Sequence, residues 1–144
     1  MSSTFYDTSK KILFRLDPER AHDVALWGLK HLNACGFSFN KNTIVNNPSN
    51  VMGLSFRNKV GLAAGLDKNG DFINSLQSLG FGFIELGTVT PKPQVGNPKP
   101  RLFRIPEAEA LVNRLGFNNK GVDYLIDRVK SSNRNAVIGI NIGK

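Results

Sequence analysis

The stretch VGLAAGLDKNG at residues 60–70 places an adjacent acid and base, Asp67 and Lys68, directly after a run of small residues. A short apolar run that ends in Asn-Gly is typical of a buried strand entering a turn. A cation at the carboxyl end of a buried strand, beside glycines that let a ligand approach the backbone, is typical of ligand sites in α/β folds. From this stretch alone, a structural turn and a ligand site are both open interpretations.

Polar clusters also follow two later apolar runs, as ELGTVTPKPQ at 85–94 and GINIGK at 139–144. Three successive strands that deliver polar residues from the same end would form one side of an active-site face. Between the last two strands, the segment 97–121 concentrates four Asn with the cations Lys99, Arg101, Arg104 and Arg114. Cations and amides with few acids suit an anionic, planar ligand. The chain has no GxGxxG or Walker-type loop, so a nucleotide site of those kinds is not indicated.

The strands that would position these clusters are expected over 60–64, 82–86 and 136–142, with helices over 70–79 and 119–131 between them. This alternation predicts right-handed βαβ units and a parallel sheet. A polar, Asn-rich connector at 36–50 precedes them, followed by an alternating stretch that reads as a hairpin. The Pro-rich part from Thr88 to Asn113 is expected to be a long excursion from the sheet.

Residues 5–34 predict two helices, the second with Asp17 as its N-cap and Pro18 at its first position. The first helix interleaves bulky apolar residues with cations, and the second has an apolar stripe broader than a short helix usually buries. This pattern favours a helix pair that rests on a membrane surface. Two helices that cap the domain core are an equally open interpretation.

The composition, with 40% hydrophobic and 21% charged residues over 144 positions, is that of one globular domain. The net charge of +8 favours anionic partners, whether a phosphate, a carboxylate, nucleic acid or an acidic membrane. Cys35 is the only cysteine, which excludes an internal disulfide and a cysteine metal cluster. No apolar stretch approaches a spanning helix or a secretory signal, so we expect a chain that is neither exported nor threaded through a bilayer.

The motifs GLAAGLDKNG, GFIELGTVTPKPQVGNPKPRLFR, NRLGFNN and GINIGK, in this order, resemble dihydroorotate dehydrogenase. The stretch LDPERAHD beside the helical N-terminal part resembles the membrane-associated, quinone-dependent class of that family. The resemblance implies an α/β fold: the N-terminal portion of a (βα)8 TIM barrel that binds flavin mononucleotide (FMN), preceded by a two-helix membrane-associating extension. The extension would cover 1–36, and 37–144 would form the first part of the barrel, truncated after the third barrel strand.

The resemblance also implies an activity, the oxidation of dihydroorotate to orotate in pyrimidine synthesis with a membrane quinone as electron acceptor. The partners would be dihydroorotate or orotate, the quinone and a membrane surface, without nucleic acid or metal. The location would be peripheral, on the cytoplasmic face of the cell membrane if the source is bacterial.

The site residues follow from the same resemblance, position by position. FMN would contact Ala64, Gly65, Leu66, Asp67, Lys68, Thr88 and Asn141. The substrate would contact Lys68, Asn113, Arg114, Leu115, Gly116 and Phe117. His22 and Arg104 would line a quinone tunnel. The alternatives are a strand-end cap for Asn141, a surface ion pair for Arg114 and a helix-surface position for His22.

A (βα)8 barrel takes roughly 250 residues, and this chain has 144. The resemblance implies that the catalytic serine, the rest of the orotate site and the FMN phosphate site lie beyond residue 144. Ser55, Ser75 and Ser78 lie outside the matching motifs, so none of them is assigned to catalysis. Two hypotheses follow: the N-terminal part of a quinone-dependent enzyme, or an inactive remnant or membrane-surface interaction module without catalysis.

Overall fold

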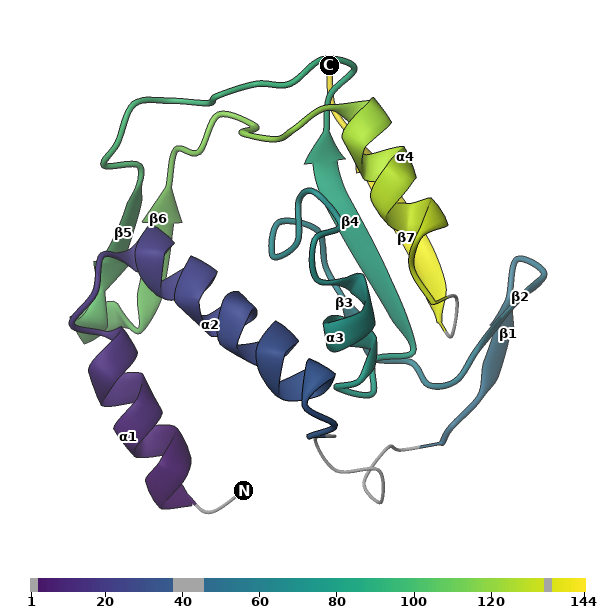
Figure 1. Cartoon of the computed structure of the whole chain (residues 1–144), viewed down its shortest axis with the longest axis horizontal. Helices are drawn as coiled ribbons and strands as arrows, with labels where there is room; N and C mark the ends of the chain where they lie inside the picture. Colours follow the sequence, from purple (N-terminus) through teal and green to yellow (C-terminus); the bar gives the residue numbers. More distant parts are fainter. Residues whose placement is uncertain (1–2, 38–45, 134–135) are drawn as a thin grey trace.

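The computed structural model describes residues 3–37, 46–133 and 136–144. The chain opens with two helices, α1 (Ser3–Leu13) and α2 (Pro18–Ala34), shown in purple and blue in Figure 1. The Asp17 carboxylate caps α2, because its Oδ1 accepts hydrogen bonds from the amides of Glu19 at 3.0 Å and Arg20 at 3.1 Å. The predicted helix pair and its cap are confirmed. No helix of the described residues is both long and apolar enough to cross a membrane.

A small antiparallel hairpin follows, formed by β1 (Ser49–Val51) and β2 (Leu54–Phe56). Its two-residue turn, Met52 and Gly53, has positive φ at both positions (51° and 76°), as a tight hairpin turn requires. The predicted hairpin is confirmed. Most of the predicted connector, residues 38–45, lies outside the described residues.

The described sheet that carries the polar clusters has three strands in the order β3-β4-β7, and both pairs are parallel. The strands are β3 (Gly61–Leu62), β4 (Phe83–Val89) and β7 (Val137–Ile142), with α3 (Ile73–Gln77) and α4 (Val122–Lys130) in the connections. The predicted βαβ pattern is confirmed. The first connecting helix is shorter than the predicted 70–79, because residues 70–72 form a turn bound by the Asp67 carboxylate.

The Pro-rich excursion after β4 contains a second hairpin that the sequence pattern did not reveal. β5 (Leu102–Ile105) and β6 (Ala110–Asn113) pair antiparallel around a short 3₁₀ turn, η1 (Pro106–Ala108). Glu109 closes that turn with a φ of 47°. Glycine or asparagine usually marks such a position, so its occupation by glutamate hides the hairpin from sequence reasoning.

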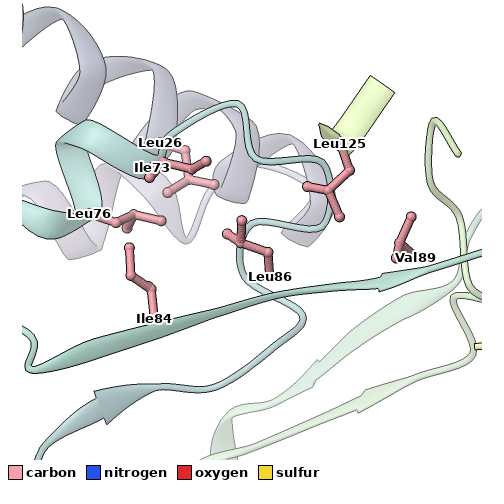
Figure 2. Packing of buried hydrophobic residues seen from close by; sticks show 7 residues of the cluster. All are labelled: Leu26, Ile73, Leu76, Ile84, Leu86, Val89 and Leu125. Carbon is pink, nitrogen blue, oxygen red and sulfur yellow. The ribbon is translucent and has the colours of Figure 1, made fainter. Parts of the chain in front are cut away.

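The core lies on one face of β4, where α2, α3 and α4 meet (Figure 2). Leu26 of α2 is buried there, whereas Val24 and Trp27 on the same helix are 50% and 60% exposed. Thus α2 caps the core with one face and keeps a second apolar face uncovered within the described residues. The buried cluster consists of Leu26, Ile73, Leu76, Ile84, Leu86, Val89 and Leu125.

Candidate functional site

The loop after β3 is held to β4 through its backbone. The Gly65 amide donates to the Gly87 carbonyl at 2.8 Å, and the Gly87 amide donates to the Asp67 carbonyl at 3.3 Å. Gly65 has a φ of +108°, and a Cβ there would meet no described atom within 4 Å apart from its chain neighbours. The loop is therefore a fixed turn, as the structural interpretation of this motif expects. Its backbone at Gly65 is also open to close approach, which a ligand site would need.

Asp67 stabilises the conformation of this loop through hydrogen bonds to its backbone. Its side chain is 2% exposed, and its carboxylate accepts hydrogen bonds from the amides of Asp71 at 3.0 Å and Phe72 at 2.8 Å. Burial raises the pKa of Asp67, although these backbone hydrogen bonds oppose the shift. Both the carboxylate and the carbonyl of Asp67 are thus used inside the chain, to hold the turn that presents Lys68.

Lys68 places a half-buried cation in the loop after β3. Its Nζ donates a hydrogen bond to Asn118 Oδ1 at 2.7 Å. Burial lowers the pKa of Lys68, and the nearby positive charge of Arg101 lowers it further. Sequence reasoning missed Asn118 as the partner of this lysine. The available signal was the Asn-Asn pair that follows Phe117, whose first member had no assigned role.

One cavity of about 510 Å³ brings together most of the predicted FMN and substrate positions. Leu66 and Asp67 are the exceptions, because they line the neighbouring cavity instead. The walls come from the loop after β3, from β4, from the loop after β6 and from β7. The lining residues are Ala64, Gly65, Lys68, Thr88, Asn97, Asn113, Arg114, Leu115, Gly116, Phe117 and Asn141.

Thr88 and Asn141 meet across the neighbouring strands β4 and β7. Thr88 Oγ1 donates to Asn141 Oδ1 at 2.6 Å, and Asn141 Nδ2 donates to Glu85 Oε1 at 3.2 Å. The other oxygen of Glu85 accepts from the Ala64 amide at 3.4 Å. Asn141 is therefore tied to side chains at the cavity wall, in contrast to the strand-end cap considered as its alternative. Sequence reasoning missed Glu85, whose signal was a single acid inside an apolar strand.

The loop after β6 is held by Asn97, which sequence reasoning also missed. Asn97 Nδ2 donates to the Arg114 carbonyl at 2.7 Å, and the Asn97 amide donates to the Leu115 carbonyl at 3.1 Å. A Cβ at Gly116, where φ is +69°, would lie 2.9 Å from the Asn97 amide nitrogen, so this position requires glycine. The Arg114 guanidinium donates to the Pro100 carbonyl at 3.0 Å, which makes it a brace for the loop.

A second cavity, of about 840 Å³, lies between α2 and the loop after β3. His22, Val24 and Trp27 of α2 line one side of it, so the structure brings His22 to a cavity wall. Arg104, on β5, is not among the described residues that line this cavity. Its guanidinium instead donates to the Leu16 carbonyl, just after α1, at 2.8 Å. The two cavities are adjacent, because they share the lining residues Ala64, Gly65, Lys68, Asn113 and Leu115.

An ion pair fastens α2 to the excursion that carries the β5–β6 hairpin. Glu19 Oε1 lies 2.5 Å from Arg101 Nη2, and Glu19 Oε2 accepts from Arg101 Nε at 3.1 Å. The side chains are 16% and 7% exposed. The hydrogen bonds from Arg101 lower the pKa of Glu19, against the opposing effect of burial. The Arg101 carbonyl in turn accepts from the Arg114 amide at 2.9 Å, so α2 is linked to the loop after β6.

The smaller cavity combines an ammonium group, several side-chain amides, a hydroxyl and an open glycine backbone. Such a set can bind a flat ligand that carries carbonyl oxygens and ring N–H groups, and the ammonium can offset a negative charge. The adjoining cavity adds apolar surface from α2.

The sequence model of the family described as dihydroorotate dehydrogenase matches residues 47–144 of this chain. The chain is 60% identical over 141 residues to "Dihydroorotate dehydrogenase (quinone)" of Proteus mirabilis, covering 97% of this chain and 42% of that protein. The protein of the same description from Pectobacterium atrosepticum is 57% identical with the same coverage. The chain thus spans less than half the length of these curated relatives.

Solved structures give the same result. The crystal structure of DHODH from Eimeria tenella in complex with ferulenol matches with a TM-score of 0.76 and 42% sequence identity. The match covers 89% of this chain and 36% of that one. The ligand-free structure from the same organism matches with a TM-score of 0.75. With a family match over more than half of its residues, this chain belongs to the dihydroorotate dehydrogenase family.

Proposed function

We propose that this chain forms the N-terminal part of a quinone-dependent dihydroorotate dehydrogenase, an FMN enzyme that oxidises dihydroorotate to orotate in pyrimidine synthesis. One observation carries the proposal: Lys68, Thr88, Asn141 and the loop 113–117, from four separate segments, line one cavity. The names of the relatives support it. In this proposal residues 1–36 form an extension, and 37–144 supply the first three strands of a (βα)8 barrel.

The residues present fit FMN. An isoalloxazine ring is flat and carries carbonyl oxygens and ring nitrogens along one edge. The open backbone at Gly65 accommodates a flat group, since a Cβ there would meet no described atom within 4 Å beyond its chain neighbours. Lys68, Thr88 and Asn141 supply a cation, a hydroxyl and an amide to the lining of the same cavity. We infer that these residues, with Ala64 and the backbone of Leu66 and Asp67, hold the ring.

The chain's own residues would then bind and orient the substrate. When bound, FMN supplies the two-electron redox chemistry of the reaction. Lys68 would offset the substrate carboxylate and the negative charge that develops during the reaction. Asn113 would pair with the amide edge of the substrate, on a loop braced by Arg114. The described lining of this cavity contains no Asp, Glu, His or Cys, so binding and charge stabilisation are the roles we give to these residues.

The larger cavity is our proposed route for the quinone. It borders the shared residues at Lys68, and α2 lines it with the apolar side chains of Val24 and Trp27, with His22 and with the acids Glu19 and Asp23. Apolar side chains are also exposed on α1, with Tyr6 at 60% and Ile12 at 59%. This face suits peripheral contact with a membrane surface, which would be the cytoplasmic face in a bacterium. Arg104, on β5, would help to fix the end of α1 beside this route through its hydrogen bonds to the backbone there.

A membrane-surface module without catalysis would leave the polar cavity without a role. The exposed apolar helices fit that alternative as well as they fit the enzyme. The gathering of Lys68, Asn113 and Asn141 around one cavity is explained by the enzyme alone.

A chimera tests the proposal. Residues 1–144 would replace the matching segment of the Proteus mirabilis relative, to which the chain is 60% identical. We expect a yellow protein that reduces a quinone with dihydroorotate, assayed beside the unaltered relative. A chimera that folds and holds flavin but is not reduced by dihydroorotate would refute the proposed substrate. Flavin reduction by dihydroorotate without quinone turnover would refute the proposed acceptor.

A further inference from the structure

The loop 67–71, which carries Lys68, contacts the segment 118–120, which lies about 50 positions later in the sequence. They are joined at three points. Lys68 Nζ donates to Asn118 Oδ1 at 2.7 Å, and the Lys120 amide donates to Asn69 Oδ1 at 2.9 Å. Lys120 Nζ lies 3.0 Å from Asp71 Oδ2. Two further contacts, both just beyond the Lys68–Asn118 pair in sequence, thus hold the two segments together.

The segment 118–120 is itself firmly held, because the next residue, Asn119, is 7% exposed and fully used. Its Nδ2 donates to the Phe117 carbonyl at 2.6 Å and to Thr90 Oγ1 at 2.8 Å. Its Oδ1 accepts from the Gly121 amide at 2.8 Å. Asn118 is therefore presented to Lys68 from a framework anchored in β4 and α4.

The partner of Lys68 is a neutral amide oxygen, and this has a chemical consequence. A carboxylate at this distance would form an ion pair and offset the lysine charge. An amide oxygen fixes the direction of the ammonium and leaves its net charge available to a ligand. Burial lowers the pKa of Lys68, and two carboxylates, Glu19 and Asp23, lie near enough to oppose that shift. Glu19 is bound to Arg101, and in the described part of the chain neither acid forms an ion pair with Lys68.

We propose that Asn118 is a positioning residue, which aims the Lys68 ammonium into the shared wall of the two cavities and keeps its charge available to an anionic substrate. The proposal deepens the proposed function and rests on it. Asn118 lines the larger cavity beside Lys68, and no part of our account of FMN or quinone binding depends on it.

The test measures orotate binding to the chimera, from the change in the flavin absorbance spectrum, for Asn118→Asp, Asn118→Ala and Asn118→Gln. Asn118→Asp keeps the shape but adds a charge beside Lys68, and we expect orotate affinity to fall about tenfold or more. Asn118→Ala should cost less, about threefold to fivefold, because the ammonium loses its direction but keeps its charge. Asn118→Gln should lie closest to the parent. The matched control is Asn50→Ala, at an exposed position of β1.

The order of these effects separates positioning from packing. If Asn118 only filled space, the isosteric aspartate would be the mildest change and alanine the worst, and that order would overturn the proposal. In a Lys68→Met background, Asn118→Ala should have no further effect on orotate affinity, because Asn118 then has no ammonium group to direct. A full additional loss there would also overturn it. Failure of the unaltered chimera to bind orotate would instead refute the proposed function.

Discussion

At the scale of single residues, the proposed site places one cation by contacts with a residue that is distant in sequence. Lys68 lies in the loop after β3, on a turn that the Asp67 carboxylate holds, and its ammonium contacts Asn118. The sequence pattern singled out Lys68 as a candidate, because a cation after a small-residue strand is a local signal. It could not reveal Asn118, Asn97 or Glu85, because their contacts join segments that are distant in sequence.

Replacing Lys68 with alanine in the chimera should slow flavin reduction by dihydroorotate. A positioned cation at developing negative charge contributes about 3 kcal/mol, or roughly a hundredfold in rate. Stopped-flow bleaching of the flavin absorbance measures this rate directly. Lys59→Ala, at an exposed lysine outside both cavities, is the matched control. A rate for Lys68→Ala within about twofold of the control would leave Lys68 with a structural role only.

At the scale of elements, the parallel sheet and the helix pair were predictable because hydrophobic period, caps and alternation are local signals. The β5–β6 hairpin was not, since its turn is closed by Glu109 with a φ of 47° and its strands lie in a Pro-rich stretch. The role of α2 was predictable only in part. Its broad apolar surface left a membrane surface and the domain core as alternative contacts, and the structure shows that Leu26 packs in the core.

The ion pair between Glu19 and Arg101 should hold α2 in place. Glu19→Gln removes one partner and leaves the Arg101 guanidinium, 7% exposed, without its counter-charge. Breaking a largely buried pair in this way costs about 3 kcal/mol. Hydrogen exchange of the α2 amides in the chimera should therefore show faster local opening at neutral pH. Glu107→Gln, on the exposed η1 turn, is the control, and equal exchange in both variants would contradict this role.

The same pair predicts a pH dependence of α2. The folded-state pKa of Glu19 is lowered, chiefly by the hydrogen bonds from Arg101. Its stabilising contribution is therefore complete above the unfolded pKa, about 4.3, and is lost as the pH falls through the lower folded value. The difference in α2 opening between the parent chimera and Glu19→Gln should be constant near neutrality and shrink in acid. A difference that grows as the pH falls would show the sign to be wrong.

Removing residues 1–35 from the chimera should separate the two half-reactions. We expect quinone turnover and membrane association to be lost, because α2 supplies one wall of the larger cavity. Flavin binding and reduction should persist, since the FMN positions lie on the sheet side. Vesicle sedimentation and assays with quinone and with a soluble dye acceptor distinguish these steps. Unchanged quinone turnover after the deletion would be incompatible with the proposed route.

At the scale of the whole molecule, the described sheet has two edges with apolar side chains. Among the described residues, β3 and β7 each pair only with β4. Ile142 of β7 is 79% exposed and Val60, just before β3, is 65% exposed. Unpaired, apolar strand edges favour association between copies of a chain. Apolar area left in water also forgoes stabilisation of about 25 cal/mol per Å².

The 144-residue chain expressed alone should therefore be poorly soluble or oligomeric, colourless after purification and inactive with dihydroorotate. Its cavities offer contacts to a flavin ring, whereas the phosphate of such cofactors is commonly held by loops after the seventh and eighth strands of a barrel. Ring contacts alone should give weak binding that does not survive dilution. Purification with excess FMN, followed by gel filtration and an absorbance spectrum, measures both properties together. A stoichiometric yellow monomer would show that three parallel strands and the N-terminal helices suffice for a flavin site, contrary to the prediction drawn from these exposed edges.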